Sequence, residues 1–182
     1  MGYGVEKMSE FVKSLVKDII IAALLAGCVL VFIRPTIVKQ TSMQNTLNPN
    51  DYIIMYKRAY SGEKAPKRGD IIIFQSTMQD EEGNDKLLIK RVIGLPGDII
   101  SIYDGKVYLN GEEYQESYIK DGKTSGFIKN LEVPQGKYFV MGDNREVSID
   151  SRYREVGFVS KSEIRGKAVL RLFPFSQFGT LS

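Results

Sequence analysis

The chain of 182 residues contains no histidine and a single cysteine. The absence of histidine excludes a Ser-His-Asp triad, a Cys-His pair and every histidine-ligated zinc site. One cysteine excludes an internal disulfide framework and a thiolate metal cluster, and Cys28 lies in an apolar run where it is expected to act as a small hydrophobe. An enzyme built from this chain must therefore use hydroxyls, carboxylates, lysine, arginine and backbone amides, and we expect neither metal nor cofactor.

Charge of one sign is also scarce. The 25 basic and 22 acidic residues leave a net charge of +3, which is too small and too evenly spread to favour nucleic acid as a partner. With 43% hydrophobic and 26% charged residues, the chain is neither disordered nor wholly a membrane protein. Its length suits one domain of ordinary size with a buried core.

The most apolar run is IIIAALLAGCVLVFI, residues 19–33, which contains no charged residue. As a helix it is roughly 22 Å long, short of the roughly 30 Å hydrocarbon thickness of a membrane, although Leu15 and Val16 can extend it. A cleavable signal peptide has an apolar region of about this length, but no small-x-small cleavage pattern follows the run. We therefore predict a retained single-pass membrane anchor at 19–33, preceded by a cytoplasmic tail at 1–18.

Basic residues lie on both sides of this run, with a slight bias that favours a cytoplasmic N-terminus. Three precede it and two follow it closely: Lys7, Lys13 and Lys17, then Arg34 and Lys39. Long domains are translocated largely regardless of charge. We expect residues 34–182 to lie on the extracytoplasmic side of the cell membrane, with the lipid bilayer as a partner.

After the anchor the pattern is typical of β-structure. Short runs rich in Ile, Val, Tyr and Phe recur, namely DYIIMY, DIIIF, LLIKRVI, DIISIY, KVYLN, KYFVM and KAVLRLF. YDGK and LNGE place Asp-Gly and Asn-Gly between such runs, which predicts hairpins. No amphipathic helix is indicated after Pro35. The pattern predicts an all-β domain, with a smaller β subdomain at about residues 100–138 between two core strands.

A polar stretch, TSMQNTL, follows the anchor and contains Ser42. Without histidine, a neutral lysine amine is the best-matched base for a serine nucleophile. A lysine of ordinary pKa is only about one part in a thousand neutral at physiological pH, so such a base needs apolar surroundings. In LLIKRVI, strand alternation gives Lys90 the neighbours Leu88 and Val92 on its own face. On these residues alone, an inert linker serine and a solvated sheet-edge lysine remain the alternative.

A third stretch, MGDNREVSIDSR at residues 141–152, concentrates opposite charges and hydroxyls. That density favours a hydrogen-bonded loop held beside a site, with a solvated loop of mixed charge as the alternative.

Four stretches in this order and at these spacings, SMQNTL, RGDIIIF, KRVIGLPGD and GDNREVSIDSR, resemble the signature boxes of bacterial type I signal peptidases, serine peptidases of the S26 type. The resemblance extends from the anchor to GKAVLRLFPF, and the single anchor is similar to the Gram-positive form. It implies a β catalytic domain of signal-peptidase and repressor type with a smaller β subdomain. It also implies removal of signal peptides from exported preproteins, with cleavage after small residues at −1 and −3 and the export translocon nearby.

The resemblance also assigns roles to individual residues. Ser42 would be the nucleophile, with its backbone amide donating to the oxyanion, and Lys90 the general base. Ser148 would hydrogen-bond to the lysine amine and orient it. Met43 and Ile89, which flank the dyad in sequence, are the expected lining of the substrate pocket. Salt bridges between the boxes would be formed by Arg91, Asp143, Asp150 and Arg152.

Two positions depart from the pattern of the family. Asn45 stands where the family usually has proline, which would stiffen the turn after the nucleophile. Gln40 stands where the family tends to have glycine or serine; serine there supplies a second oxyanion donor in some members, and the Gln40 amide is a candidate for that role. Neither change touches Ser42, Lys90 or Ser148, so we expect activity on a restricted substrate set.

Two other functions fit parts of the sequence. A non-hydrolytic, membrane-anchored peptide-binding factor for the assembly of surface proteins or pili would keep the fold without the chemistry. Asn45 and Gln40 favour it, whereas the intact serine and lysine argue against it. A self-cleaving repressor-type peptidase shares the chemistry and the β core, but it would carry a DNA-binding helix bundle in place of the membrane span.

Overall fold

The structure is a computed structural model that describes residues 2–181, and it describes the side chains of residues 11–120 and 122–181. The chain forms two compact units, one that ends at Arg34 and one that begins at Pro35. Each unit is described by itself below.

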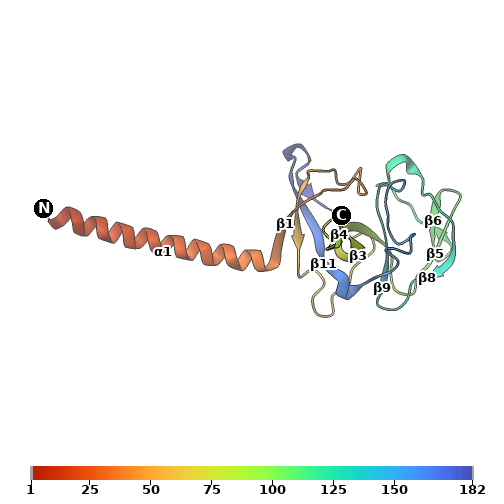
Figure 1. Ribbon diagram of the computed structural model, residues 1–182, viewed down its shortest axis with the longest axis horizontal. Helices are drawn as coiled ribbons and strands as arrows, with labels where there is room; N and C mark the ends of the chain where they lie inside the picture. Colours follow the sequence, from red (N-terminus) through yellow and green to blue (C-terminus); the bar gives the residue numbers. More distant parts are fainter. Residues whose placement is uncertain (1, 182) are drawn as a thin grey trace. The chain divides into compact units, whose positions relative to one another are not determined.

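The first unit is a single helix, α1 (Gly2–Phe32) (Figure 1). Its segment Phe11–Phe32 contains an 18-residue window with a mean hydropathy of 2.5 and is long and apolar enough to cross a membrane. The helix is longer than the predicted anchor, because it includes the described part of the predicted tail; Met1 lies outside the described residues. It ends one residue earlier than predicted, since Pro35 lacks a backbone N–H and restricts Arg34 to extended conformations.

The second unit confirms the all-β prediction. Among its described residues, helical structure is limited to three short 3-10 turns, η1 (Lys120–Gly122), η2 (Lys161–Glu163) and η3 (Phe175–Gln177). The strands are β1 (Ile33–Ile37), β2 (Tyr52–Tyr56), β3 (Ile71–Gln79), β4 (Asp85–Gly94), β5 (Ile99–Tyr103), β6 (Lys106–Leu109), β7 (Glu112–Glu113), β8 (Ile128–Glu132), β9 (Lys137–Met141), β10 (Val159–Ser160), β11 (Ile164–Phe173) and β12 (Gly179–Thr180).

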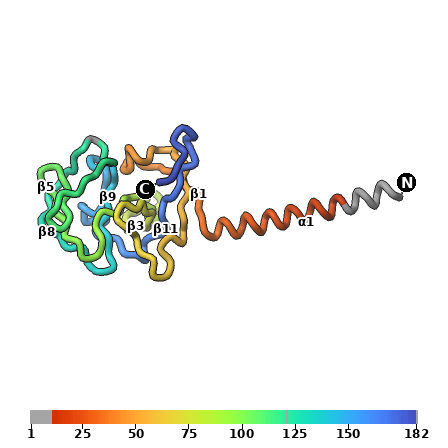
Figure 2. The backbone as a smooth tube through the Cα atoms, turned by 180° about the vertical axis from the view of Figure 1, so that it is seen from behind, coloured from red at the N-terminus to blue at the C-terminus, as the bar shows by residue number. Residues whose placement is uncertain are grey.

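These strands form two sheets (Figures 1 and 2). The larger sheet has the order β1-β2-β11-β3-β4-β9-β10, with β12 paired to β11, and the smaller has the order β7-β6-β5-β8. Both predicted hairpins occur in the smaller sheet. Asp104 and Gly105 take φ values of 50° and 77°, and Asn110 and Gly111 take 54° and 88°, as two-residue hairpin turns require.

Strand β4 lies inside the larger sheet, between β3 and β9. Its side chains enter three separate hydrophobic clusters: Ile89 packs against the first, Ile93 belongs to the second, and Leu88 and Val92 belong to the third. A strand covered on both faces reads as a nearly continuous apolar run, which is why LLIKRVI contains so few polar residues. Lys90 is therefore in the interior of the sheet rather than at its edge.

Candidate active site

Ser42, which lies in a turn, meets Lys90, which lies in strand β4. Lys90 pairs in register with Ile72 of β3, and Leu88 and Val92 lie two residues away on the same strand, so its stem is surrounded by aliphatic side chains. Its exposed fraction is 1% and that of Ser42 is 8%. Lys90 Nζ lies 2.7 Å from Ser42 Oγ and donates a hydrogen bond to it. The structure thus brings together two residues that are 48 positions apart in the sequence.

The surroundings of Lys90 favour the neutral amine. Burial lowers its pKa from 10.5 to about 8, although the negative charges of Asp150 and Asp143 act in the opposite direction. Within the described part of the chain, no carboxylate forms an ion pair with the amine. With such a pKa, about one amine in ten is neutral at pH 7, roughly three-hundredfold more than for a lysine of ordinary pKa. The pair is therefore suited to removing a proton from the serine.

The turn that carries Ser42 is tied to the loop after β9. The backbone N–H of Asn144 donates to the Ser42 carbonyl at 3.0 Å. The Asn144 side-chain amide donates to the Thr41 carbonyl at 3.2 Å and to Gln44 Oε1 at 3.3 Å. These bonds hold the serine at a defined distance from the loop of residues 142–152.

Gly142 of the same loop also lies close to Ser42. A β-carbon at this position would overlap the carbonyl oxygen of Ser42 and the side chain of Ser148, so any larger residue would push them apart. The N–H of Gly142 donates to Asp150 Oδ2 at 3.0 Å. The glycine is required here by close approach, not by an unusual backbone conformation.

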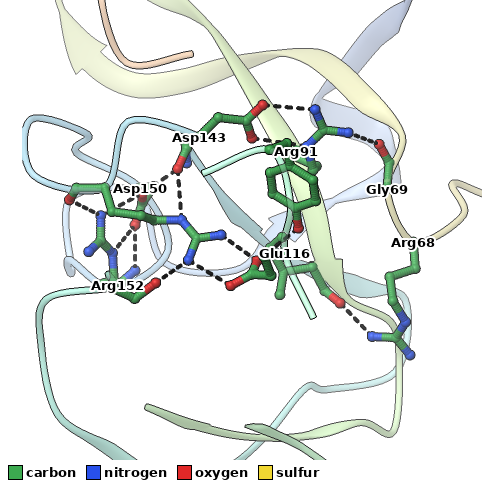
Figure 3. A network of polar contacts seen from close by, with 12 residues as sticks. Arg68, Gly69, Arg91, Glu116, Asp143, Asp150 and Arg152 are labelled. Carbon is green, nitrogen blue, oxygen red and sulfur yellow. Dashed lines mark hydrogen bonds and ion pairs between the residues drawn. The ribbon is translucent and has the colours of Figure 1, made fainter. Parts of the chain in front are cut away.

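The four residues predicted to form salt bridges are arranged as two buried ion pairs (Figure 3). Arg91 pairs with Met141 in register, which brings Asp143 within reach of its guanidinium. Arg91 donates to both oxygens of Asp143, at 2.9 and 2.8 Å, and Arg152 donates to both oxygens of Asp150, at 2.8 and 2.9 Å. Paired forks of this kind are strong and directional.

Arg91 shows how a buried cation is stabilised. Burial alone would lower its pKa, but the hydrogen bonds and the charge of Asp143 raise the pKa above its ordinary value. The guanidinium also donates to the Gly69 carbonyl at 2.9 Å and lies 4.0 Å from the centre of the Tyr118 ring. Arg91 therefore keeps its positive charge, and it connects the loop of residues 142–152 to Gly69 and to Tyr118.

Ser148 differs from its prediction. Its exposed fraction is 1%, and within the described residues its hydroxyl has no hydrogen-bond partner. The predicted hydrogen bond to the Lys90 amine is thus not present in this structure. The hydroxyl instead lies against Gly142, close to the backbone of the turn that carries Ser42.

A cleft of about 330 Å³ opens beside the pair, and both Ser42 and Lys90 line it. The predicted lining residues lie elsewhere: Met43 is packed in the first hydrophobic cluster, and Ile89 packs against that same cluster. Ile89 is adjacent to Lys90 on the strand, so its side chain points to the opposite face. The cleft contains the predicted oxyanion residue Gln40, and its other lining residues are Lys39, Thr41, Met78, Lys86, Leu88, Val147 and Ile149.

Same-face alternation could have found Leu88, which precedes Lys90 by two residues. No local pattern in the sequence indicates that Val147 and Ile149 face the cleft from the loop. Another missed residue is Glu116, which forms a buried ion pair with Arg145. Within the described residues, no group of three or more His, Cys, Asp or Glu side chains could hold a metal ion.

An all-β domain with a serine hydroxyl on a buried lysine amine is typical of hydrolases that activate serine without histidine. Residues 10–173 match the family model for signal peptidase, peptidase S26. The chain is 38% identical over 175 residues to signal peptidase I of Bacillus licheniformis, with 89% of each chain covered. It is 37% identical over 167 residues to signal peptidase I U of Bacillus subtilis, with 87% of this chain and 86% of that one covered.

A crystal structure of a signal peptidase I from Enterococcus faecalis is 35% identical in sequence, with a TM-score of 0.47 over 58% of this chain and 98% of that one. The family assignment depends on the sequence matches, which cover most of the chain. This chain belongs to the peptidase S26 family of signal peptidases.

Proposed function

We propose that this signal peptidase removes signal peptides from exported preproteins with Ser42 as nucleophile and Lys90 as general base. The contact between Lys90 Nζ and Ser42 Oγ, at 2.7 Å, is the observation that carries the proposal. An amine that is 1% exposed and has a pKa lowered to about 8 can accept a proton at working pH. The relatives are peptidases, so a purely peptide-binding role in the assembly of surface proteins or pili is not favoured.

The proposed reaction proceeds in two steps. The neutral Lys90 amine takes the Ser42 hydroxyl proton as Oγ attacks the scissile carbonyl carbon, and the carbonyl oxygen becomes an oxyanion. When the C–N bond breaks, the Lys90 ammonium returns the proton to the leaving amine and an ester to Ser42 remains. A water molecule, deprotonated by Lys90, then attacks the ester; Lys90 returns the proton to Ser42 Oγ as the C–O bond breaks, and the signal peptide leaves with a free carboxylate.

Groups near Ser42 are proposed to stabilise the oxyanion. The Ser42 backbone N–H is one donor, and the Gln40 side-chain amide, from the same cleft, is the second. Such donors are typically worth a few kcal/mol each in the transition state. The apolar side chains Met78, Leu88, Val147 and Ile149 line the cleft, which supports a preference for small apolar residues at the −1 and −3 positions of the substrate.

The family and the apolar helix indicate that the protein is anchored to the membrane. We further propose that residues 34–182 lie on the extracytoplasmic side, near the export translocon, where the cleavage site of an exported preprotein emerges. Protease or labelling accessibility of the β domain in intact spheroplasts tests this orientation. A domain reached only after lysis would contradict it.

Cleavage of a model preprotein by the full-length chain in detergent tests the dyad. The substrate carries Ala at −1 and −3, and Ser42→Ala and Lys90→Ala are each expected to abolish cleavage. Matched controls are Ser61→Ala and Lys64→Ala, because both side chains are exposed and lie away from the cleft; both variants should cleave normally. Activity that survives either dyad change would refute the assignment.

A further inference from the structure

A segment between two strands of the smaller sheet contacts the loop of residues 142–152, which lies against Ser42. Residues 116–124, here called the clamp segment, lie in the connection between β7 and β8 and contribute no strand. The backbone N–H of Lys120 donates to the Asp143 carbonyl at 3.0 Å, and the Tyr118 ring lies 4.0 Å from the Arg91 guanidinium carbon. The clamp segment therefore touches both members of the Arg91–Asp143 ion pair.

A buried ion pair of Glu116 with Arg145 also joins the clamp segment to the loop of residues 142–152. The side chain of Arg145 is 0% exposed and that of Glu116 is 4% exposed. Both carboxylate oxygens accept hydrogen bonds from the guanidinium, and the Thr124 hydroxyl accepts another. A buried guanidinium is strongly destabilising without its carboxylate, so Glu116 determines where Arg145 can lie.

Arg145 transmits this placement to the nucleophile. Its Nε donates to the Gly142 carbonyl at 2.9 Å, while Asp150 accepts the N–H of the same glycine. The peptide groups on both sides of Gly142 are thus held by ionic side chains. The α-carbon between them lies directly against the Ser42 carbonyl and Ser148.

We propose that Glu116 is a positioning residue for the cleavage reaction. Through Arg145 it holds Gly142 and the loop of residues 142–152 at the distance from Ser42 that the attack geometry requires. This inference rests on the proposed function of Ser42 and Lys90. Glu116 touches neither the substrate nor the reacting atoms. It acts on the position of Ser42 relative to Lys90.

The test compares Glu116→Gln with the double variant Glu116→Gln/Arg145→Gln in the full-length chain. Each variant is assayed for kcat and KM on the model preprotein, well below its own Tm, and for thermal unfolding by circular dichroism. Glu116→Gln leaves an unpaired buried charge, so we expect a lower Tm. Its kcat should fall roughly 10- to 100-fold, the size of effect expected for a misplaced reacting group, with KM changed less than about twofold.

The double variant separates positioning from stability. Removing both charges relieves the uncompensated burial, so Tm should recover, but a glutamine at 145 cannot reproduce the guanidinium contacts to Gly142 and the clamp segment together. We therefore expect kcat to remain low in a folded enzyme with normal KM. A double variant with wild-type kcat would overturn the proposal, as would a Glu116→Gln variant with wild-type kcat. If Glu116→Gln does not fold, the kcat of the double variant alone decides.

Glu113→Gln is the matched control. Glu113 lies in β7 of the smaller sheet and forms an ion pair with Lys106. That pair is exposed, and among the described residues no hydrogen bond joins it to Gly142 or Arg145, so kcat and Tm should not change. Ser42→Ala, measured in parallel, distinguishes failure of the positioning role from failure of the proposed dyad. If Ser42→Ala is inactive and the Glu116 variants are normal, only the positioning role fails; if Ser42→Ala is active, the proposed dyad itself fails.

Discussion

Lys90 and Arg91 are neighbours on β4, and both are almost completely buried, with 1% and 2% exposure. Their environments are nevertheless opposite. Arg91 donates to both oxygens of Asp143, and its pKa is raised. Lys90 contacts the Ser42 hydroxyl, and burial lowers its pKa to about 8.

The difference arises because alternate side chains of a strand point to opposite faces. On the face of Arg91, a carboxylate compensates the buried charge, so the cation is permanent and holds segments together. On the face of Lys90, aliphatic neighbours disfavour the charge and none of the carboxylates that the structure describes forms an ion pair with it, so the amine can release its proton. Two neighbouring residues of one strand are thus buried with opposite results: Arg91 keeps its positive charge, and the neutral form of Lys90 is favoured.

The largest expected effect comes from making Lys90 resemble its neighbour. Lys90→Arg replaces the base with a guanidinium that stays protonated at working pH, and Lys90→Met removes the base at similar volume. Each should lower kcat/KM for the model preprotein by about 10²- to 10⁴-fold, the usual contribution of a general base. Arg91→Lys, assayed beside them, keeps a cation opposite Asp143 and should lose much less activity. Comparable losses at the two positions would contradict the division of roles.

The converse change removes the carboxylate that compensates the buried positive charge of Arg91. Asp143→Asn leaves a buried guanidinium without its carboxylate, and we expect a loss of about 3–5 kcal/mol in the free energy of unfolding. Urea unfolding followed by circular dichroism measures it. Glu113→Gln at the exposed ion pair with Lys106 is the control and should change stability little. Equal losses in the two variants would mean that burial does not distinguish these ion pairs.

Much of this arrangement could be predicted from the sequence. Alternation around Lys90 indicated an apolar face, the turn dipeptides indicated the hairpins of the small sheet, and the β-rich runs indicated the fold. Only the family resemblance predicts the contact between Ser42 and Lys90, because no local pattern relates residues 48 positions apart.

Side-chain direction and long-range pairing were beyond local patterns. Met43 and Ile89 are adjacent in sequence to the dyad, yet both pack toward the first hydrophobic cluster, because neighbouring residues on a turn or strand point to different sides. Glu116 lies 29 residues from Arg145, in a segment with no periodicity. Its role becomes visible only when the clamp segment is seen against the loop of residues 142–152.

The pH dependence of stability sharpens the comparison further. Since the pKa of Lys90 is lowered from 10.5 to about 8, the folded protein binds fewer protons than the unfolded chain between these pH values, and stability rises with pH there. The penalty for burying the charged amine is fully present below pH 8. The free energy of unfolding of wild type, minus that of Lys90→Met, should rise by roughly 2 kcal/mol between pH 7.5 and 9.5. A flat difference would show that the amine is not desolvated.

The same titration should appear in catalysis. The kcat/KM of the wild type should fall about tenfold per pH unit below an acidic limb near pH 8, because protonated Lys90 cannot act as a base. Asp143 raises the pKa of Lys90 by its charge, so the limb of Asp143→Asn should move to lower pH. A wild-type limb near pH 10 would mean that Lys90 is solvated.

The smallest expected effect concerns the hydroxyl of Ser148. The buried Ser148 hydroxyl has no hydrogen-bond partner among the described residues, and burying an unpaired polar group is destabilising. If the hydroxyl is retained for its predicted role in orienting the amine, Ser148→Ala should lower kcat about tenfold and raise the free energy of unfolding by about 1 kcal/mol. Ser151→Ala is the informative contrast, since the Ser151 hydroxyl accepts a hydrogen bond from the Val140 N–H at 2.8 Å and its loss should destabilise the fold. A Ser148→Ala variant that is less stable and fully active would assign this hydroxyl to the structure rather than to the reaction.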